Sequence, residues 1–342
     1  MEEPSNLPPN PIEEPVDRAS LLRPDSVDPD FDIAIKYGWG FWLDQGFVWL
    51  VFGFALGTVT IFLWMSSVVF QKALPAVQRF GLGFWWSQDW DVGRLAFGAL
   101  PFIYGTLVSS MIALVIAVPV GMAVAVVTSE NFLPEWLRSP LGFLVELIAA
   151  IPSVIVGLWG IFVLIPGLQP FQLWLFQHLN WLPLFSTQPF GPGMLAAGII
   201  LAVMILPTMA AVSREVLLAV PEELRAGSMA LGATRWETIF GVLLPAGISG
   251  ILGATVLALG RALGETMAVT MVIGNTPQIS PSLLDPAYTI PAVLANEFAE
   301  ASELLQIGAL MYLALILFAL TLVVNILALL MVRLFNRQQN DA

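Results

Sequence analysis

Two charged residues, Arg261 and Glu265, interrupt an apolar stretch of the chain at residues 247–274. Because they are four residues apart, a helix would place both side chains on one face and within reach of each other. An ionised side chain near the centre of a bilayer costs about 2.5–3.5 kcal/mol on insertion scales, so such residues normally face the interior of a helix bundle. The pair therefore predicts either a polar path for a ligand or a salt bridge that pins helices together. In the first case, the forked guanidinium would suit an oxyanion.

The second informative feature is a polar segment, residues 213–246, between two apolar stretches. Pro221 suits the first position of a helix, and the acidic Glu222 and Glu223 complement the positive end of its dipole. Gly232 suits the position at which that helix stops. We therefore expect a short helix, which includes Arg225 and Ala226, followed by a glycine turn.

A second short helix is expected directly after this turn. Thr234 and Glu237 have the spacing of a capping box, in which each side chain binds the backbone of the other residue. Leu244–Pro245 is expected to end the second helix. The segment would then be a helix, a glycine turn and a helix on one face of the membrane. That is more structure than a simple connector requires, so the segment is either a docking site for a partner or a connector that caps the helix bundle.

The composition excludes a soluble domain and most enzyme classes. Of the 342 residues, 58% are hydrophobic and 11% are charged, against about 25% charged residues in a typical soluble domain. The chain has no cysteine and one histidine, His178, which lies in an aromatic stretch and is interpreted as an interfacial residue. We therefore expect no catalytic residue, no metal and no cofactor. Nucleic acid is not expected as a partner either, because the sequence has no basic patch.

Six apolar stretches are long enough to cross a bilayer as helices, which takes about 20 residues. They are residues 48–70, 100–127, 141–165, 193–212, 247–274 and 304–332. Pro119, Pro152 and Pro207 lie inside them, where neighbouring helices can cover the freed backbone groups. Glu146, near the start of the third stretch, is expected to reach the cytoplasmic interface, with a place in the ligand path as the alternative. The expected fold class is an all-α membrane protein with six spans.

The lysine and arginine residues in the loops predict the orientation. If the N-terminus is cytoplasmic, nine of them lie on the inner side and three, Lys72, Arg79 and Arg94, lie on the outer side. The inner nine are Arg18, Arg23, Lys36, Arg138, Arg214, Arg225, Arg235, Arg333 and Arg337. This asymmetry places both termini and the segment 213–246 in the cytoplasm.

Three regions are expected along the chain. Residues 1–46 contain ten acidic and three basic residues and many prolines, so we expect a disordered acidic cytoplasmic tail. The aromatic stretch Tyr37–Trp49, which begins in this tail, is expected to lie flat at the membrane interface. Residues 47–335 would form the membrane domain, and residues 336–342 a cytoplasmic C-terminal tail.

The segment 213–246 resembles the EAA loop of binding-protein-dependent ABC importer permeases. That pattern is EAA, three residues, Gly, nine residues and Ile-x-Leu-Pro, and here Gly232 is followed after nine residues by Val242-Leu243-Leu244-Pro245. The EAA positions hold Ala226-Gly227-Ser228, so the acidic residue is absent, and Glu222 and Glu223 lie one turn earlier. The resemblance implies a MetI-like fold with a coupling helix that sits in a groove of an ATPase subunit.

Several motifs from residue 100 to the C-terminus resemble one branch of this family, the PstC-type permeases of the phosphate-specific ABC importer. They are Tyr104-Gly105-Thr106-Leu107, Ala150-Ile151-Pro152-Ser153-Val154, Gly260-Arg261-Ala262-Leu263-Gly264-Glu265-Thr266-Met267-Ala268-Val269 and Leu294-Ala295-Asn296-Glu297-Phe298-Ala299-Glu300-Ala301. The resemblance implies that Arg261 and Glu265 take part in phosphate passage.

The same resemblance implies the partners and the location. A PstA-like permease would form a heterodimer with this chain, a PstB-like ATPase dimer would lie below it, and a PstS-like phosphate-binding protein above it. The complex would be embedded in the lipid of the inner (plasma) membrane of a bacterium. The chain would be a transport subunit and not an enzyme, since it has no GxxxxGK[ST] loop with which to hydrolyse ATP.

Three other functions fit parts of the sequence. A permease of the same class could carry another oxyanion, such as sulfate or molybdate. A secondary transporter could use Glu265 and Glu146 as proton relays and would need no ATPase. An intramembrane enzyme is disfavoured by the scarcity of nucleophiles and bases.

Overall fold

The computed structural model describes residues 39–130 and 132–340, most of which are helical. The chain divides into two compact units, Met1–Leu63 and Trp64–Ala342. In the first unit the described residues belong to a single helix with nearly all its side chains exposed, as expected of a helix that contacts lipid. All further packing described below lies within the second unit.

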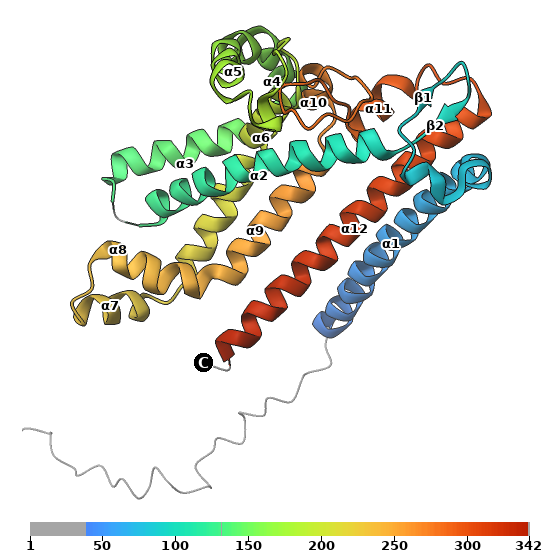
Figure 1. The fold of residues 1–342 in the computed structure, drawn as a ribbon. Coiled ribbons are helices and arrows are strands. Elements are labelled where there is room, and N and C mark those ends of the chain that lie inside the picture. Colours follow the sequence, from blue (N-terminus) through green and yellow to red (C-terminus); the bar gives the residue numbers. More distant parts are fainter. Residues whose placement is uncertain (1–38, 131, 341–342) are drawn as a thin grey trace, which may run out of the picture. The chain divides into compact units, whose positions relative to one another are not determined.

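The described residues include twelve α-helices and two short strands (Figure 1). They are α1 (Trp39–Phe80), β1 (Trp90–Asp91), β2 (Ala96–Phe97), α2 (Leu100–Ser129), α3 (Glu135–Ala149), α4 (Ser153–Trp159), α5 (Ile165–Leu179), α6 (Met194–Leu218), α7 (Glu222–Ala230), α8 (Arg235–Thr238), α9 (Leu244–Gly264), α10 (Met267–Val272), α11 (Ile290–Glu297) and α12 (Leu304–Asn340). Short 3₁₀ turns at Gly81–Trp85 and Pro183–Phe185 and π turns at Gly160–Leu164 and Ile239–Leu243 complete the helical elements.

Six helical segments are long and apolar enough to cross a membrane, which confirms the predicted all-α membrane fold. They are Trp42–Trp85, Leu100–Ser129, Ser153–Leu179, Met194–Leu218, Arg235–Gly264 and Leu304–Leu330. Pro119 and Pro207 lie inside α2 and α6, as predicted.

The described residues include only parts of the two predicted tails. Most of the predicted tail, residues 1–38, and residues 341–342 lie outside the described residues. Residues 39–49, expected to lie flat at the interface, form the start of α1, since no proline separates them from the apolar stretch that follows. Residues 336–340 continue α12.

The third span was predicted wrongly. Residues 141–165 do not form one helix, because α3 ends at Ala149 and α4 begins at Ser153. Pro152 has no N–H to donate and disfavours a helical residue before it, so the chain breaks at this point. The span is Ser153–Leu179. Glu146 consequently lies on α3, outside the six segments.

The fifth span begins and ends earlier than predicted, at Arg235 and Gly264. The stretch 247–274 divides into α9 and α10, since Glu265 has an extended backbone with φ −69° and ψ 126°. The predicted end at Leu244–Pro245 is wrong as well, because α8, the π turn and α9 are continuous over Arg235–Gly264. The Leu244 N–H bonds the carbonyl of Ile239. This wider turn accommodates Pro245, which cannot donate a hydrogen bond of its own. The same arrangement occurs where the Ile165 N–H bonds the Gly160 carbonyl, directly before Pro166.

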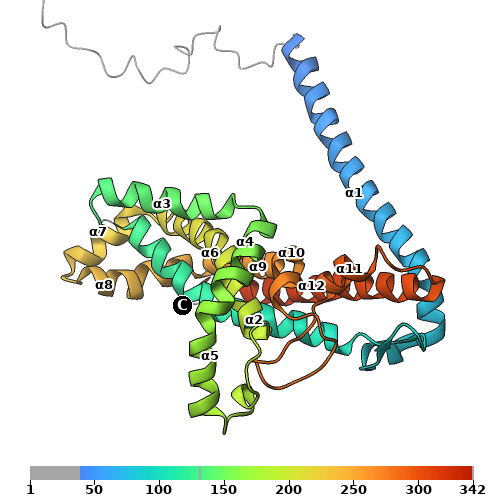
Figure 2. The ribbon, with the colours of Figure 1, turned by 90° about the horizontal axis from the view of Figure 1, so that it is seen from above.

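The core of the second unit is formed by α2, α6 and α9. The most extensive contacts join α2 to α6, and α9 packs against α6, α2 and α12. Figure 2 shows α3 along the edge of this group, where it contacts α6 and α2. Small residues such as Ala113, Ala197 and Ala258 are fully buried in the core and allow the helices to approach closely.

A second cluster lies at the opposite end of α2 from α7 and α8 (Figure 1). Strands β1 and β2 form an antiparallel hairpin whose Trp90 packs against Phe97 and Phe102. The Trp90 indole donates a hydrogen bond of 3.0 Å to Glu297 on α11. At the start of α2, Gly105 lies directly against the backbone of Tyr288, which precedes α11.

We expect Gly105→Ala to destabilise the fold, because a Cβ atom there would lie 2.3 Å from the Tyr288 carbonyl oxygen. Forcing a methyl group into a packed site costs about 1–3 kcal/mol. Gly253→Ala is the matched control, because a Cβ on that residue of α9 meets nothing within 4 Å. Thermal unfolding of the purified chain in detergent would show a lower midpoint for Gly105→Ala alone. Equal midpoints for both variants would contradict this packing.

Candidate functional site

Arg261 lies in the last turn of α9 and does not pair with Glu265. Its Nη1 donates a hydrogen bond of 3.4 Å to the Thr208 hydroxyl on α6. The expectation that Arg261 and Glu265 share a helical face is wrong, because the helix ends at Gly264 and Glu265 has left the helical path. Among the described ion pairs, none joins the two residues. The interpretation as a salt bridge that pins helices together therefore has no support in this conformation.

Arg261 lines an open cavity of about 650 Å³ between α6, α9 and α12. The lining residues are Thr208, Gly253, Val256, Leu257, Gly260, Arg261, Asn325, Ala328, Leu329 and Val332. Arg261 is the one charged residue among them, and Thr208 and Asn325 supply the other polar side chains. The cavity thus offers a guanidinium, a hydroxyl and an amide in an apolar wall, which is a donor set suited to an anion.

Thr208 and Asn325 did not emerge from the sequence analysis. Asn325 stands alone in the apolar run of α12, and an isolated polar residue in such a run is a signal that could have identified it. Thr208 gave no comparable signal, because threonine is common in membrane helices and its role depends on the approach of α9.

Glu265 stands at the break between α9 and α10 and does not line the Arg261 cavity. Its neighbours Gly264 and Thr266 line a different cavity of about 450 Å³, together with residues of α11 and α12. In this conformation the structure places the two predicted path residues in separate surroundings. Their joint action would require a movement at the break.

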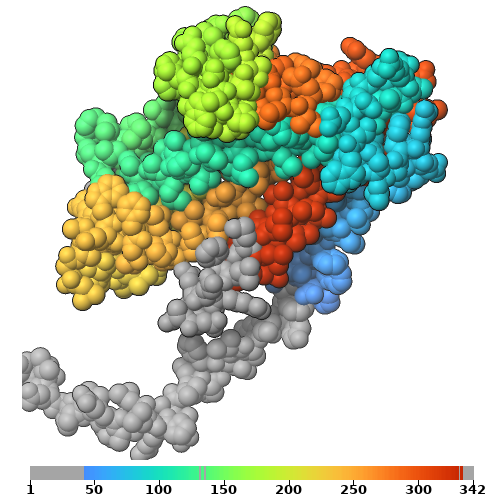
Figure 3. Space-filling view, in the orientation of Figure 1, coloured from blue at the N-terminus to red at the C-terminus, as the bar shows by residue number. Residues whose placement is uncertain are grey.

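Helices α7 and α8 form a knob, residues 222–238, which protrudes at one end of the second unit (Figure 3). The predicted order of helix, glycine turn and helix is confirmed. Gly232 has φ +90°, a conformation that strains residues with a Cβ atom. Pro221 lies one position earlier than predicted, as the residue before α7.

The capping box of α8 is present as predicted. The Thr234 backbone N–H donates to Glu237 Oε2 at 2.7 Å, and the Glu237 N–H donates to Thr234 Oγ1 at 3.3 Å. Together these bonds satisfy two donors at the start of α8. The start of α8 and the turn before it are therefore determined by neighbouring residues in the sequence.

Arg225 fastens the knob to the ends of two spans. Its Nη2 donates a hydrogen bond of 2.6 Å to the Leu217 carbonyl in the last turn of α6. Its Nε lies 3.3 Å from Glu130 Oε1, directly after α2, in an ion-pair contact without hydrogen-bond geometry. Both side chains are largely buried, with 17% and 21% exposed. Glu130 was missed by the sequence analysis, because no local pattern links it to α7.

Apolar contacts support the same junction. Phe132 stacks on Trp236 of α8 with ring centroids 5.0 Å apart. Val126 of α2, Leu217 of α6 and Ile239 and Leu243 of the π turn form a buried cluster beneath the knob. The knob is therefore packed against α2 and α6 as well as continuous with α9.

The outer surface of the knob carries both charged and apolar side chains. Glu222, Glu223 and Ala226 are exposed, and Leu231 in the turn is 92% exposed. Leu224, Met229 and Trp236 are exposed on the same knob, and several exposed apolar side chains on one element are typical of an interaction surface. This surface suits the docking of another protein.

Comparison with known proteins defines the class of protein. Residues 117–340 match the family described as "Binding-protein-dependent transport system inner membrane component". The chain is also similar in fold to a permease chain in a crystal structure of a bacterial alginate ABC transporter in complex with an alginate pentasaccharide-bound periplasmic protein. That match has a TM-score of 0.56 at 17% identity and covers 84% of this chain and 95% of the other. A second alginate importer structure matches with a TM-score of 0.52 at 17% identity and covers 84% and 98% of the two chains.

Curated relatives narrow the family. The phosphate transport system permease protein PstC of Pasteurella multocida is 45% identical over 280 residues, which are 80% of this chain and 87% of that protein. PstC of Xylella fastidiosa is 43% identical over 271 residues, 78% and 83% of the two chains. This chain belongs to the binding-protein-dependent ABC importer permeases and, among them, to the PstC family. It is a multi-pass membrane protein and a transport subunit, not an enzyme, of an importer with further subunits.

We expect Glu130→Gln to loosen the knob without unfolding the spans, because it removes one charge from the Arg225 contact and keeps the side-chain size. Hydrogen–deuterium exchange of the α7 amides should rise about fivefold, the equivalent of about 1 kcal/mol for a partly exposed ion pair. Glu215→Gln, an exposed position on α6, makes the same charge change and should leave α7 unchanged. Equal exchange in both variants would show that the ion pair does not hold the knob.

Proposed function

We propose that this chain is the permease subunit through which an ATP-driven importer moves inorganic phosphate into the cell. The observation that carries the proposal is the identity of 42–45% with relatives named as phosphate permeases, over about four fifths of the chain. The Arg261 cavity adds chemistry that fits this substrate, since a guanidinium fork matches phosphate oxygens. The relatives reported above are all named for phosphate, and nothing in the geometry favours sulfate, molybdate or a proton-coupled mechanism.

The proposed assembly has four kinds of partner. A second, PstA-like permease pairs with this chain in the lipid bilayer, and a PstS-like binding protein delivers phosphate from outside. A PstB-like ATPase dimer receives the knob through Glu222, Glu223, Ala226 and the exposed Leu231. The proposed location is the inner (plasma) membrane of a bacterium with both termini cytoplasmic, which is supported by the nine inner and three outer basic residues.

Arg261 is proposed to bind phosphate directly on its passage. Its one described hydrogen bond, to Thr208, is 3.4 Å long and therefore weak, so the guanidinium can exchange Thr208 for a phosphate oxygen at little cost. Thr208 and Asn325 would then serve as further polar contacts in the same cavity. Glu265 would join them only when the break between α9 and α10 changes conformation.

We expect Arg261→Gln to reduce phosphate uptake at least tenfold, because the variant keeps a donor but loses the charge and the forked geometry. Labelled-phosphate uptake in phosphate-starved cells that lack this chain, rescued with wild type or variant at equal membrane level, measures the effect. Arg94→Gln removes an exposed arginine outside the cavity and should rescue fully. Equal rescue by Arg261→Gln would remove Arg261 from the path but leave the importer intact. Failure of the wild type to rescue would refute the substrate.

Glu265 is proposed to contribute selectivity. Phosphate still carries a proton at neutral pH, whereas sulfate does not, so only phosphate can donate a hydrogen bond to the Glu265 carboxylate. A buried polar group left without its partner discriminates strongly between substrates. Glu265→Gln should therefore reduce phosphate uptake while residual sulfate uptake stays constant, as measured with both labelled anions. An equal loss for the two anions would contradict this role.

A further inference from the structure

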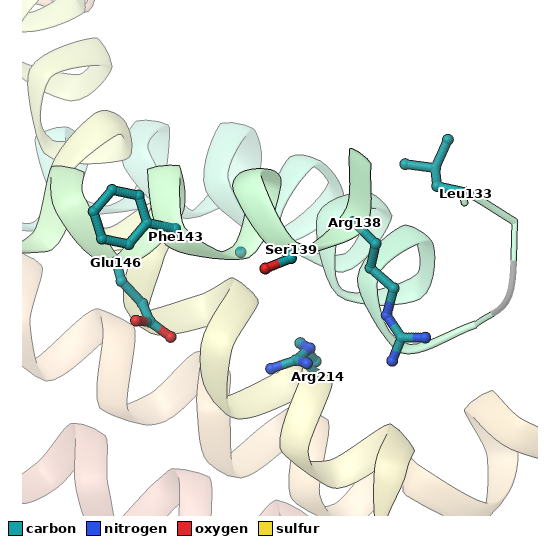
Figure 4. A pocket seen from close by; sticks show the side chains of 7 residues that line it. Leu133, Arg138, Ser139, Phe143, Glu146 and Arg214 are labelled. Atoms are coloured by element: carbon teal, nitrogen blue, oxygen red, sulfur yellow. The ribbon is translucent and has the colours of Figure 1, made fainter. Parts of the chain in front are cut away.

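A third cavity, of about 620 Å³, lies between α3 and α6, apart from the Arg261 cavity. Figure 4 shows the side chains that line it: Leu133, Arg138, Ser139, Gly142, Phe143, Glu146 and Arg214. The polar ends of Arg138, Ser139, Glu146 and Arg214 approach the same open space between the two helices (Figure 4). Nothing in the proposed transport path uses this group of residues.

The two arginines belong to different helices, and both line the cavity near the C-terminal end of α2. Arg214, on α6, donates from Nε to the Thr128 carbonyl in the last turn of α2 at 3.4 Å. Among the described residues its terminal Nη groups make no hydrogen bond, and they point into the cavity (Figure 4). Arg138 lies in the first turns of α3, directly after the loop from α2. Both side chains are partly buried, so their charges are less screened than on an open surface.

The charged residues of the cavity suit an anionic ligand that also carries a hydrogen-bond donor. Two guanidinium groups and one carboxylate line the cavity. Glu146 lies eight residues beyond Arg138 on α3, a distance of about 12 Å along a helix. The Glu146 carboxylate, farther along the same cavity, can accept a hydrogen bond from a second polar group of a molecule whose phosphate binds at the arginines. A glycerophospholipid headgroup has this arrangement, and a free phosphate ion does not.

The surroundings of the cavity favour a lipid as well. Helix α3 lies outside the six membrane-crossing segments, and its apolar side chains are exposed next to the cavity, with Trp136 at 73%, Phe143 at 64% and Leu147 at 50%. Helix α3 runs beside α2 and packs against α2 and α6 (Figures 1 and 2), so its exposed apolar face is in a position to contact the acyl chains of lipids. Basic pockets between membrane helices on the cytoplasmic side bind lipid headgroups.

We propose that the α3–α6 cavity binds the phosphate group of an anionic glycerophospholipid of the inner leaflet. Arg138 and Arg214 hold the phosphate oxygens, Ser139 donates a further hydrogen bond, and Glu146 accepts from the headgroup. The acyl chains cover the apolar face of α3. The bound lipid holds α3 against α6 beside the junction that carries the knob.

The test measures lipid retention by the full-length chain. Chains purified from vesicles of phosphatidylglycerol and phosphatidylcholine in equal amounts are examined by native mass spectrometry. The wild type should retain phosphatidylglycerol in preference to phosphatidylcholine, and Arg138→Gln and Arg214→Gln should each lower the retained amount about fivefold. Arg333→Gln, an exposed arginine at the end of α12, is the charge-matched control and should retain as much as the wild type.

A second variant keeps the test decisive if the loss of an arginine disturbs folding. Ser139→Trp leaves both arginines in place and fills the opening of the cavity, so it should also lose the lipid. Retention of phosphatidylglycerol by all three cavity variants would overturn the proposal, and so would an equal loss in Arg333→Gln. Equilibrium dialysis with inorganic phosphate separates the two sources of a phosphate group. Saturable phosphate binding that depends on Arg138 and Arg214, without lipid preference, would assign the cavity to the free ion instead. If a second permease chain covers the cavity, the bound lipid will be lost when the importer assembles. That result would also overturn the lipid proposal.

Discussion

Arg225 bonds a carbonyl at the end of α6 and lies against a carboxylate at the end of α2, and both contacts start from one side chain of the knob. A hydrogen bond from a charged donor contributes about 1.5–3 kcal/mol, and loss of the arginine would leave Glu130 largely buried without its partner. The guanidinium also complements the negative end of the α6 dipole. Through this one residue the knob is held to the ends of two spans.

The knob is connected to the proposed path by a continuous helix. The segment Arg235–Gly264 begins at the capping box of α8 and has Arg261 in its last turn. Its 30 residues correspond to a length of about 45 Å. Because Arg225 and the Phe132–Trp236 stack hold the knob against α2 and α6, a force applied to the knob moves these helices together with α9. The helical path from the knob to Arg261 is irregular at the π turn before Pro245, and the helix breaks after Gly264.

Local rules predicted those parts of the structure that neighbouring residues determine. The Thr234–Glu237 box, the Gly232 turn and five of the six spans, apart from their ends, follow from sequence spacing and apolar length. Two failures have a common cause, since Pro152 and Glu265 lie within apolar stretches whose hydropathy does not reveal a break. At Pro245 the failure is the opposite one, because the π turn lets the helix continue where a proline was expected to end it. Contacts such as Arg225 with Glu130, or Arg261 with Thr208, join residues far apart in the sequence. A single sequence without its fold contains no local signal for them.

Coupling of the knob to the spans by Arg225 is tested most directly by the ratio of phosphate transported to ATP hydrolysed. The measurement uses the complete importer in proteoliposomes, with wild type, Arg225→Lys and Arg225→Gln. If Arg225 couples the knob to the spans, Arg225→Gln retains the ATPase rate but moves several-fold less phosphate per ATP, and Arg225→Lys falls between. A parallel loss of hydrolysis and transport with an unchanged ratio would contradict it, because the arginine would then serve assembly and not coupling.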